Sequence, residues 1–192
     1  LPPPVVRLKD AIAAADGLLL CTPEYNNAMP GVAKNAFDWL SRPPSDSARV
    51  FRGRPVALAG ASPGGFGTIL AQDAWLPVFR TLGAELWAEG RLLVSRAGGV
   101  FGPDGALTHV ATRESLEKFL TGFVAHKVAG RPDAFNCPAD AHALGGVQRC
   151  FEIGAPILTI GQAAIPPDFE ACFLQHTHQA RHSHFVFALI RD

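Results

Sequence analysis

Two short segments of the chain carry residue types that are suited to holding a ligand. Residues 22–30 read TPEYNNAMP, which places a carboxylate, a phenol and two amides between two prolines. Residues 62–67 read SPGGFG, in which small residues let the backbone approach a flat molecule closely. Because proline fixes φ and asparagine tolerates unusual backbone angles, the first segment can turn its backbone N–H groups outward. Together the segments suit a planar heteroaromatic ring with carbonyl and imine acceptors.

The glycine-rich segment matches other motifs only in part, and an ordinary turn remains an alternative for it. Gly60, Ser62 and Gly64 fit the G-x-S-x-G pattern of serine hydrolases. However, Pro63 follows the serine and has no N–H for an oxyanion hole, so the main electrostatic contribution would be missing. The segment also lacks the second glycine of G-x-G-x-x-G and the lysine of a P-loop. Neither hydrolysis nor nucleotide-phosphate binding is therefore favoured.

Each of the two segments directly follows a short apolar run, which is typical of a buried parallel strand. These runs are residues 17–22 (GLLLCT) and 54–61 (RPVALAGA), and residues 84–95 are also strand-like. Strands that alternate with helices predict an α/β fold with a parallel sheet, in which ligands bind beyond the carboxyl ends of the strands. Helices are expected from the apolar spacing at about residues 2–16, 30–42, 68–82 and 108–127.

Two of these helices have an expected inner face. For residues 30–42 the inner face is Val32, Ala33, Ala36, Phe37 and Leu40. For residues 108–127 it is Leu116, Phe119, Leu120 and Phe123. Pro77 is expected to kink or restart the helix that contains it.

Composition limits the class of protein. The chain has 192 residues, of which 48% are hydrophobic, and Lys plus Arg (17) balance Asp plus Glu (17). A zero net charge disfavours nucleic-acid binding, and no apolar run is long enough to span a bilayer. The four cysteines form no C-x-x-C pair, so no zinc site or disulfide framework is indicated. A soluble, cytoplasmic protein is expected, with no nucleic-acid or membrane partner.

Residues 22–43, TPEYNNAMPGVAKNAFDWLSRP, resemble the signature of the NADPH-dependent FMN reductase family, which contains flavodoxin-like quinone, azo-dye and chromate reductases. The resemblance continues through residues 53–65 and 82–84 and covers about residues 2–127. It implies a three-layer fold with a parallel sheet in the order 2-1-3-4-5 and FMN at the strand ends.

The resemblance also implies an activity, a cofactor and the residues that surround it. Hydride would pass from the co-substrate NAD(P)H to N5 of FMN, and then to a quinone, azo compound or similar small-molecule acceptor. No catalytic side chain is expected, because the cofactor carries the chemistry. The flavin ring and ribityl chain would lie among Pro23, Glu24, Tyr25 and Asn26. The pyrimidine side of the ring would lie along Ser62, Gly64 and Gly65. A homodimer or a dimer of dimers through the helix at 30–42 is implied.

The chain also departs from the family pattern. Residues 1–130 are interpreted as a partial flavodoxin-like domain that lacks the family's first strand-helix-strand and its phosphate loop, and residues 131–192 as a tail of unknown structure. The strand at 17–22 would then have an open edge, which residues 155–160, or alternatively 185–190, are expected to cover. A flavodoxin-like domain without bound FMN, acting as a non-catalytic interaction module or fragment, is the alternative function. No metal site is assigned to the histidines of the tail, His176, His178, His182 and His184.

Overall fold

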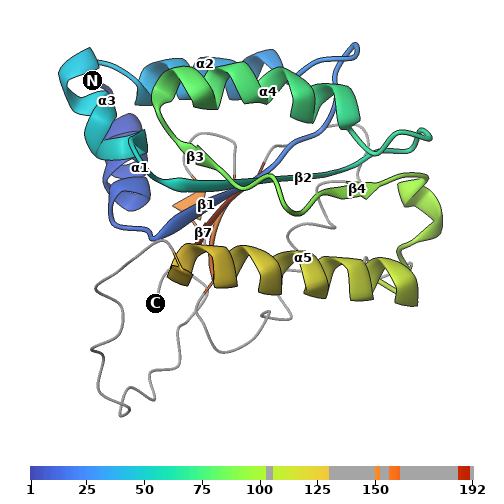
Figure 1. The fold of residues 1–192 in the computed structure, drawn as a ribbon. Helices are drawn as coiled ribbons and strands as arrows, with labels where there is room; N and C mark the ends of the chain where they lie inside the picture. The colour runs from blue at the N-terminus through green and yellow to red at the C-terminus, as the bar shows by residue number, and fades with distance from the viewer. Residues whose placement is uncertain (103–105, 130–149, 152–155, 161–185, 191–192) are drawn as a thin grey trace.

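The computed structural model describes residues 1–102, 106–129, 150–151, 156–160 and 186–190 (Figure 1). The four histidines considered as metal ligands lie outside the described residues. The helices are α1 (Pro3–Ala13), α2 (Gly31–Leu40), α3 (Pro44–Phe51), α4 (Ile69–Leu82), the short 3-10 helix η1 (Ala97–Gly99) and α5 (Val110–Ala129). The strands are β1 (Gly17–Cys21), β2 (Pro55–Ala61), β3 (Glu85–Leu86), β4 (Leu92–Val94), β5 (Cys150–Phe151), β6 (Pro156–Ile160) and β7 (Val186–Ile190).

The predicted parallel sheet is confirmed for β1 to β4. β1 pairs with β2 in parallel, with Leu18 opposite Val56 and Cys21 opposite Ala59. β3 and β4 also pair in parallel with β2, at its beginning and its end respectively. The expected strand over residues 84–95 is therefore two short strands. Between them the buried Trp87 packs against Gly90, where a Cβ would lie 2.2 Å from the indole ring.

The open edge of β1 is covered by β7, which runs antiparallel to β1 with Leu18 opposite Leu189. β6 lies one strand further out and is parallel to β7. The alternative at residues 185–190 is thus confirmed, and the expectation that residues 155–160 pair directly with β1 is wrong. Both segments are short apolar runs, so their composition did not distinguish them. The described sheet has the order β3-β2-β1-β7-β6-β5 and is mixed, not parallel throughout.

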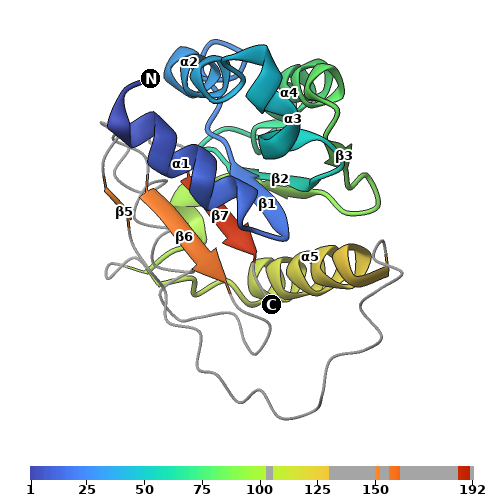
Figure 2. The ribbon, with the colours of Figure 1, turned by 90° about the vertical axis from the view of Figure 1, so that its left-hand side faces the viewer.

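The sheet separates two helical layers (Figures 1 and 2). Leu18 and Leu20 face a core that includes apolar residues from α1, α2, α3 and α4. Leu19 and Cys21 face the opposite core, which is closed by α5. This division follows from the strand period of two, since successive side chains of β1 point to opposite faces. It confirms the predicted three-layer arrangement.

The helices largely follow their predicted positions. The expected inner face of α5 is buried, as are Ala33, Phe37 and Leu40 of α2. Val32 is 63% exposed, so the prediction that it lies on the inner face of α2 is wrong. α4 continues through Pro77 as one helix and does not restart there. No helix within the described ranges is long and apolar enough to cross a membrane.

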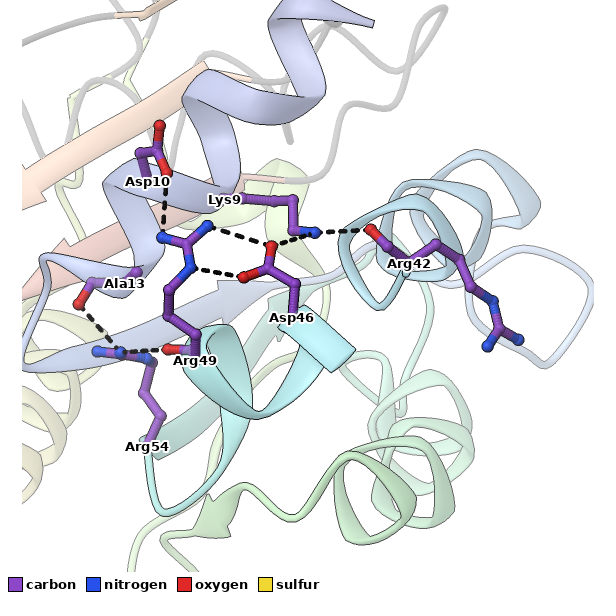
Figure 3. Close-up of polar contacts among 7 residues, drawn as sticks. All are labelled: Lys9, Asp10, Ala13, Arg42, Asp46, Arg49 and Arg54. Carbon is purple, nitrogen blue, oxygen red and sulfur yellow. Dashed lines mark hydrogen bonds and ion pairs between the residues drawn. The ribbon is translucent and has the colours of Figure 1, made fainter. Parts of the chain in front are cut away.

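An ion-pair network joins α1 to α3 (Figure 3). The side chain of Lys9 is 1% exposed, and its Nζ lies 2.6 Å from Asp46 Oδ2. Lys9 also donates to the carbonyl oxygen of Arg42 at 2.6 Å. Arg49 reaches Asp46 at 2.7 Å and Asp10 at 3.0 Å, so it links the two helices a second time. Hydrogen bonds from Arg49 and then Lys9 hold the pKa of Asp46 well below its usual range.

Candidate functional site

The loop after β1 contains a tight two-residue turn. Tyr25 N–H donates to Ala28 O at 2.9 Å, and Ala28 N–H donates back to Tyr25 O at 3.0 Å. Between them Asn26 and Asn27 have φ values of 50° and 61°. Positive φ at both central residues is the geometry of a type I′ turn, which asparagine adopts more readily than most residues. The asparagine pair therefore fixes the shape of this loop, and both side chains are exposed.

Thr22 attaches the same loop to the core. Its side chain is 1% exposed, and its N–H donates to Ala59 O of the neighbouring strand at 2.9 Å. The Trp75 indole N–H of α4 donates to Thr22 Oγ1 at 3.2 Å. A buried hydroxyl that is satisfied in this way places the start of the loop firmly over the carboxyl end of β1.

Glu24 connects this loop to α4. Its Oε2 accepts hydrogen bonds from Leu70 N–H at 2.9 Å and from Ala71 N–H at 3.1 Å. These are unpaired donors of the first helical turn, and Thr68 at the N-cap position supplies no side-chain cap. The carboxylate is also favoured there by the helix dipole. The structure thus gives Glu24 an anchoring role, which the sequence alone did not indicate.

The glycine-rich loop after β2 is fixed at its base by backbone hydrogen bonds. Ser62 N–H donates to Val94 O at 2.9 Å, and Ala97 N–H donates to Ser62 O at 3.0 Å. Arg96 N–H donates to Gly64 O at 2.9 Å. The loop is therefore held against the end of β4 and the turn that follows it.

The glycines around this loop serve two different purposes. A Cβ on Gly60 would lie 1.8 Å from Thr68 Oγ1, and one on Gly67 would lie 2.6 Å from the Leu93 carbonyl carbon. Packing therefore requires these two glycines. Gly64 and Gly65 have nothing within 4 Å of a Cβ position. Within the described ranges, the N–H groups of these two residues donate to no acceptor. They leave an open backbone surface with free donors, which suits the edge of a flat ring that bears carbonyl groups.

The structure brings the two predicted segments to one end of the sheet. β1 and β2 are parallel neighbours, so the loop with Pro23, Glu24, Tyr25 and Asn26 and the loop with Ser62, Gly64 and Gly65 leave the sheet in the same direction (Figure 1). The contact between Glu24 and α4 connects them, because α4 begins directly after the second loop.

One further candidate was missed from the sequence. Phe66, inside the glycine-rich loop, is 75% exposed, and Tyr25 on the other loop is 38% exposed. An aromatic residue between glycines was the available signal. Each loop therefore presents one aromatic side chain at its surface.

Comparison with known proteins agrees with this geometry. The family model described as NADPH-dependent FMN reductase matches residues 1–99. The NAD(P)H-dependent FMN reductase PA1204 of Pseudomonas aeruginosa is 41% identical over 119 residues, which are 62% of this chain and 63% of that protein. A 2-hydroxy-1,4-benzoquinone reductase of Burkholderia sp is 40% identical over 64% of this chain and 67% of that protein.

A solved structure supports the same assignment. The flavoenzyme NAD(P)H:(acceptor) oxidoreductase FerB of Paracoccus denitrificans has a TM-score of 0.62 and 33% identity, over 67% of this chain and 70% of that one. The match to the Pseudomonas protein spans less than two thirds of that relative's length. The chain belongs to the NADPH-dependent FMN reductase family, whose fold is flavodoxin-like, whose cofactor is FMN and whose co-substrate is NAD(P)H.

Proposed function

We propose that residues 1–130 form an NAD(P)H-dependent FMN reductase domain that delivers electrons to a quinone, azo compound or similar acceptor. The observation that carries this proposal is the joining of the two loops by Glu24, beside the open backbone at Gly64 and Gly65. When bound, FMN would accept hydride at N5 and pass the electrons on.

The residues of the two loops have distinct parts in this proposal. The N–H groups of Gly64 and Gly65 would donate to the carbonyl oxygens of the flavin pyrimidine, with Ser62 at the base of the same edge. The turn at Asn26 and Asn27 would hold the Tyr25 ring beside the flavin ring or ribityl chain, and Pro23 precedes that turn. Preformed donors of this kind stabilise negative charge on a reduced ring without reorganisation.

The acceptor and the assembly are also proposals. Quinones are favoured because the Burkholderia relative is named a benzoquinone reductase. A homodimer through α2 is supported by Trp39, which is 43% exposed on the outer face of that helix. We place the enzyme in the cytoplasm, where NAD(P)H is supplied.

FMN binding by the purified chain tests the proposal. FMN is titrated with the chain while flavin fluorescence and absorbance are followed, and quinone-dependent NAD(P)H oxidation is then measured. Gly65→Val adds a branched side chain where nothing packs and φ is not positive, so it should keep the fold and weaken FMN binding. Gly98→Val is the matched control, since Gly98 is also open and lies outside both loops.

The possible results are separable. Stoichiometric FMN in the unmodified chain and in Gly98→Val, with a clear loss in Gly65→Val, supports the placement. Equal FMN affinity in all three chains contradicts the placement at Gly65. A folded chain that takes up no FMN supports the alternative of a non-catalytic flavodoxin-like domain.

A further inference from the structure

A hollow of about 440 Å³ lies beyond the end of β4, between the turn at Arg96 and the beginning of α5. Its polar lining includes Ser95, Arg96, His109 and Thr112. Among the described residues that line it, none is Asp or Glu, and Arg96 contributes a positive charge. A described lining that carries a cationic guanidinium and no carboxylate is suited to an anion.

Arg96 is held at this hollow in an unusual backbone conformation. Its φ is 50°, in the left-handed region that favours glycine. Its N–H donates to Gly64 O at 2.9 Å, and its carbonyl oxygen accepts from Gly99 N–H at 3.0 Å. In the described part of the chain its guanidinium makes no hydrogen bond or ion pair. A strained position that keeps a long charged side chain in place of glycine points to a role for that side chain.

The neighbouring side chains complete a set of donors. His109 Nδ1 lies 2.9 Å from Thr112 Oγ1, which orients the imidazole, and no residue that the structure describes hydrogen-bonds to its Nε2. Arginine, histidine and hydroxyl groups are the side chains that bind phosphate oxygens well. The hollow therefore has the chemistry of a phosphate site.

We propose that this hollow, termed the Arg96 hollow, binds a phosphate group of the dinucleotide co-substrate. This rests on the proposed function, because it assumes that NAD(P)H is used. The hydrogen bond between Arg96 and Gly64 makes the Arg96 hollow a direct neighbour of the open glycine loop. A dinucleotide with its nicotinamide at that loop carries its pyrophosphate, and in NADPH a further phosphate, outward from the ring.

Three variants of the full chain test the proposal. Arg96→Gly removes the guanidinium and suits the positive φ, so the fold is preserved. Arg96→Lys keeps the charge. Arg91→Gln is the matched control, because Arg91 is exposed just before β4 and does not line the hollow. KM for NADPH and NADH is measured, together with calorimetric binding of NADP⁺ and NAD⁺ and the dissociation constant of FMN.

The expected result is a rise of about tenfold or more in KM and in the oxidised dinucleotide's dissociation constant for Arg96→Gly, the usual effect of losing a charged hydrogen bond. Arg96→Lys should recover part of the loss, and Arg91→Gln should change little. A loss for NADPH and NADP⁺ alone identifies the additional phosphate, and a loss for both pairs identifies the pyrophosphate. Unchanged dinucleotide binding in Arg96→Gly overturns the proposal, as does a loss confined to FMN affinity. If the unmodified chain binds no FMN, the proposed function fails, whereas dinucleotide binding still reports on Arg96.

Discussion

The carboxylate of Glu24 accepts the backbone N–H of Leu70 at 2.9 Å, across 46 positions of sequence. This contact connects the loop that follows β1 to the first turn of α4, and α4 starts where the glycine-rich loop ends. The two loops consequently have a fixed separation before any ligand binds. Such preorganisation lowers the conformational cost of binding a rigid ring.

Replacing Glu24 should reduce stability as the loss of a helix cap does. We expect Glu24→Ala to lower the free energy of unfolding by about 1 kcal/mol, because Leu70 and Ala71 lose their acceptor. Glu24→Gln keeps an acceptor oxygen and should lose less. Urea denaturation measures both, with the exposed Glu117→Gln as control. An Ala variant as stable as the unmodified chain would show that water replaces the carboxylate without loss.

The type I′ turn makes a second prediction about stability. Asn27 has a φ of 61°, which a β-branched residue adopts only with strain. Asn27→Val should therefore destabilise the chain by about 1–3 kcal/mol, whereas Asn27→Gly should be tolerated. Asn35→Val on the exposed face of α2 is the control, since the same change in a helix costs only a few tenths of a kcal/mol. Equal melting temperatures for the two valine variants would contradict the turn geometry.

Local signals predicted much of this structure. The two apolar runs gave β1 and β2, and the apolar spacing gave α1, α2, α4 and α5 close to their observed bounds. The two ligand-suited loops followed from the residue types after each strand. These features are determined by residues that are close in the sequence, so local patterns were sufficient to predict them.

Long-range features were not predictable in the same way. α3 (Pro44–Phe51) follows the expected helix at 30–42 directly, and no helix was predicted there. No local pattern in the sequence indicates that Lys9 of α1 is buried. Its burial depends on Asp46 and Arg42, which come from a distant segment. The choice of β7 over β6 as the neighbour of β1 depends on chain topology, because both segments are short runs of mostly apolar residues. The sequence likewise predicts that Glu24 binds a ligand, because its contact with the first turn of α4 depends on where α4 lies in the fold.

The contacts of Asp46 with Arg49 and Lys9 should make the stability of the chain depend on pH. The pKa of Asp46 is lowered in the folded chain, chiefly by Arg49, so folding favours its ionised form. Its contribution is present above the ordinary carboxyl pKa of about 4 and is lost as pH falls below that value towards the folded pKa. Asp46→Asn should therefore flatten the acid side of the stability profile between about pH 5 and pH 2.

The measurement is the urea midpoint at a series of pH values. Asp73→Asn, which removes an exposed carboxylate that makes no ion pair within the described ranges, is the control and should keep the slope of the unmodified chain. An Asp46→Asn profile that parallels the unmodified one would exclude this carboxylate as a source of acid sensitivity.

The two kinds of glycine in the site should differ in how much stability they lose on replacement by alanine. A Cβ on Gly60 meets Thr68 Oγ1 at 1.8 Å and Thr22 O at 2.6 Å, and the second of these atoms belongs to backbone that cannot move away. Gly60→Ala should therefore lower the free energy of unfolding by about 1–3 kcal/mol, as overpacking of a core does. Gly64→Ala adds its methyl group to open space and should change stability by no more than about 0.5 kcal/mol. Thermal denaturation of the two variants decides the matter: if Gly64→Ala were the more damaging, the open surface proposed to receive the flavin would instead be packed.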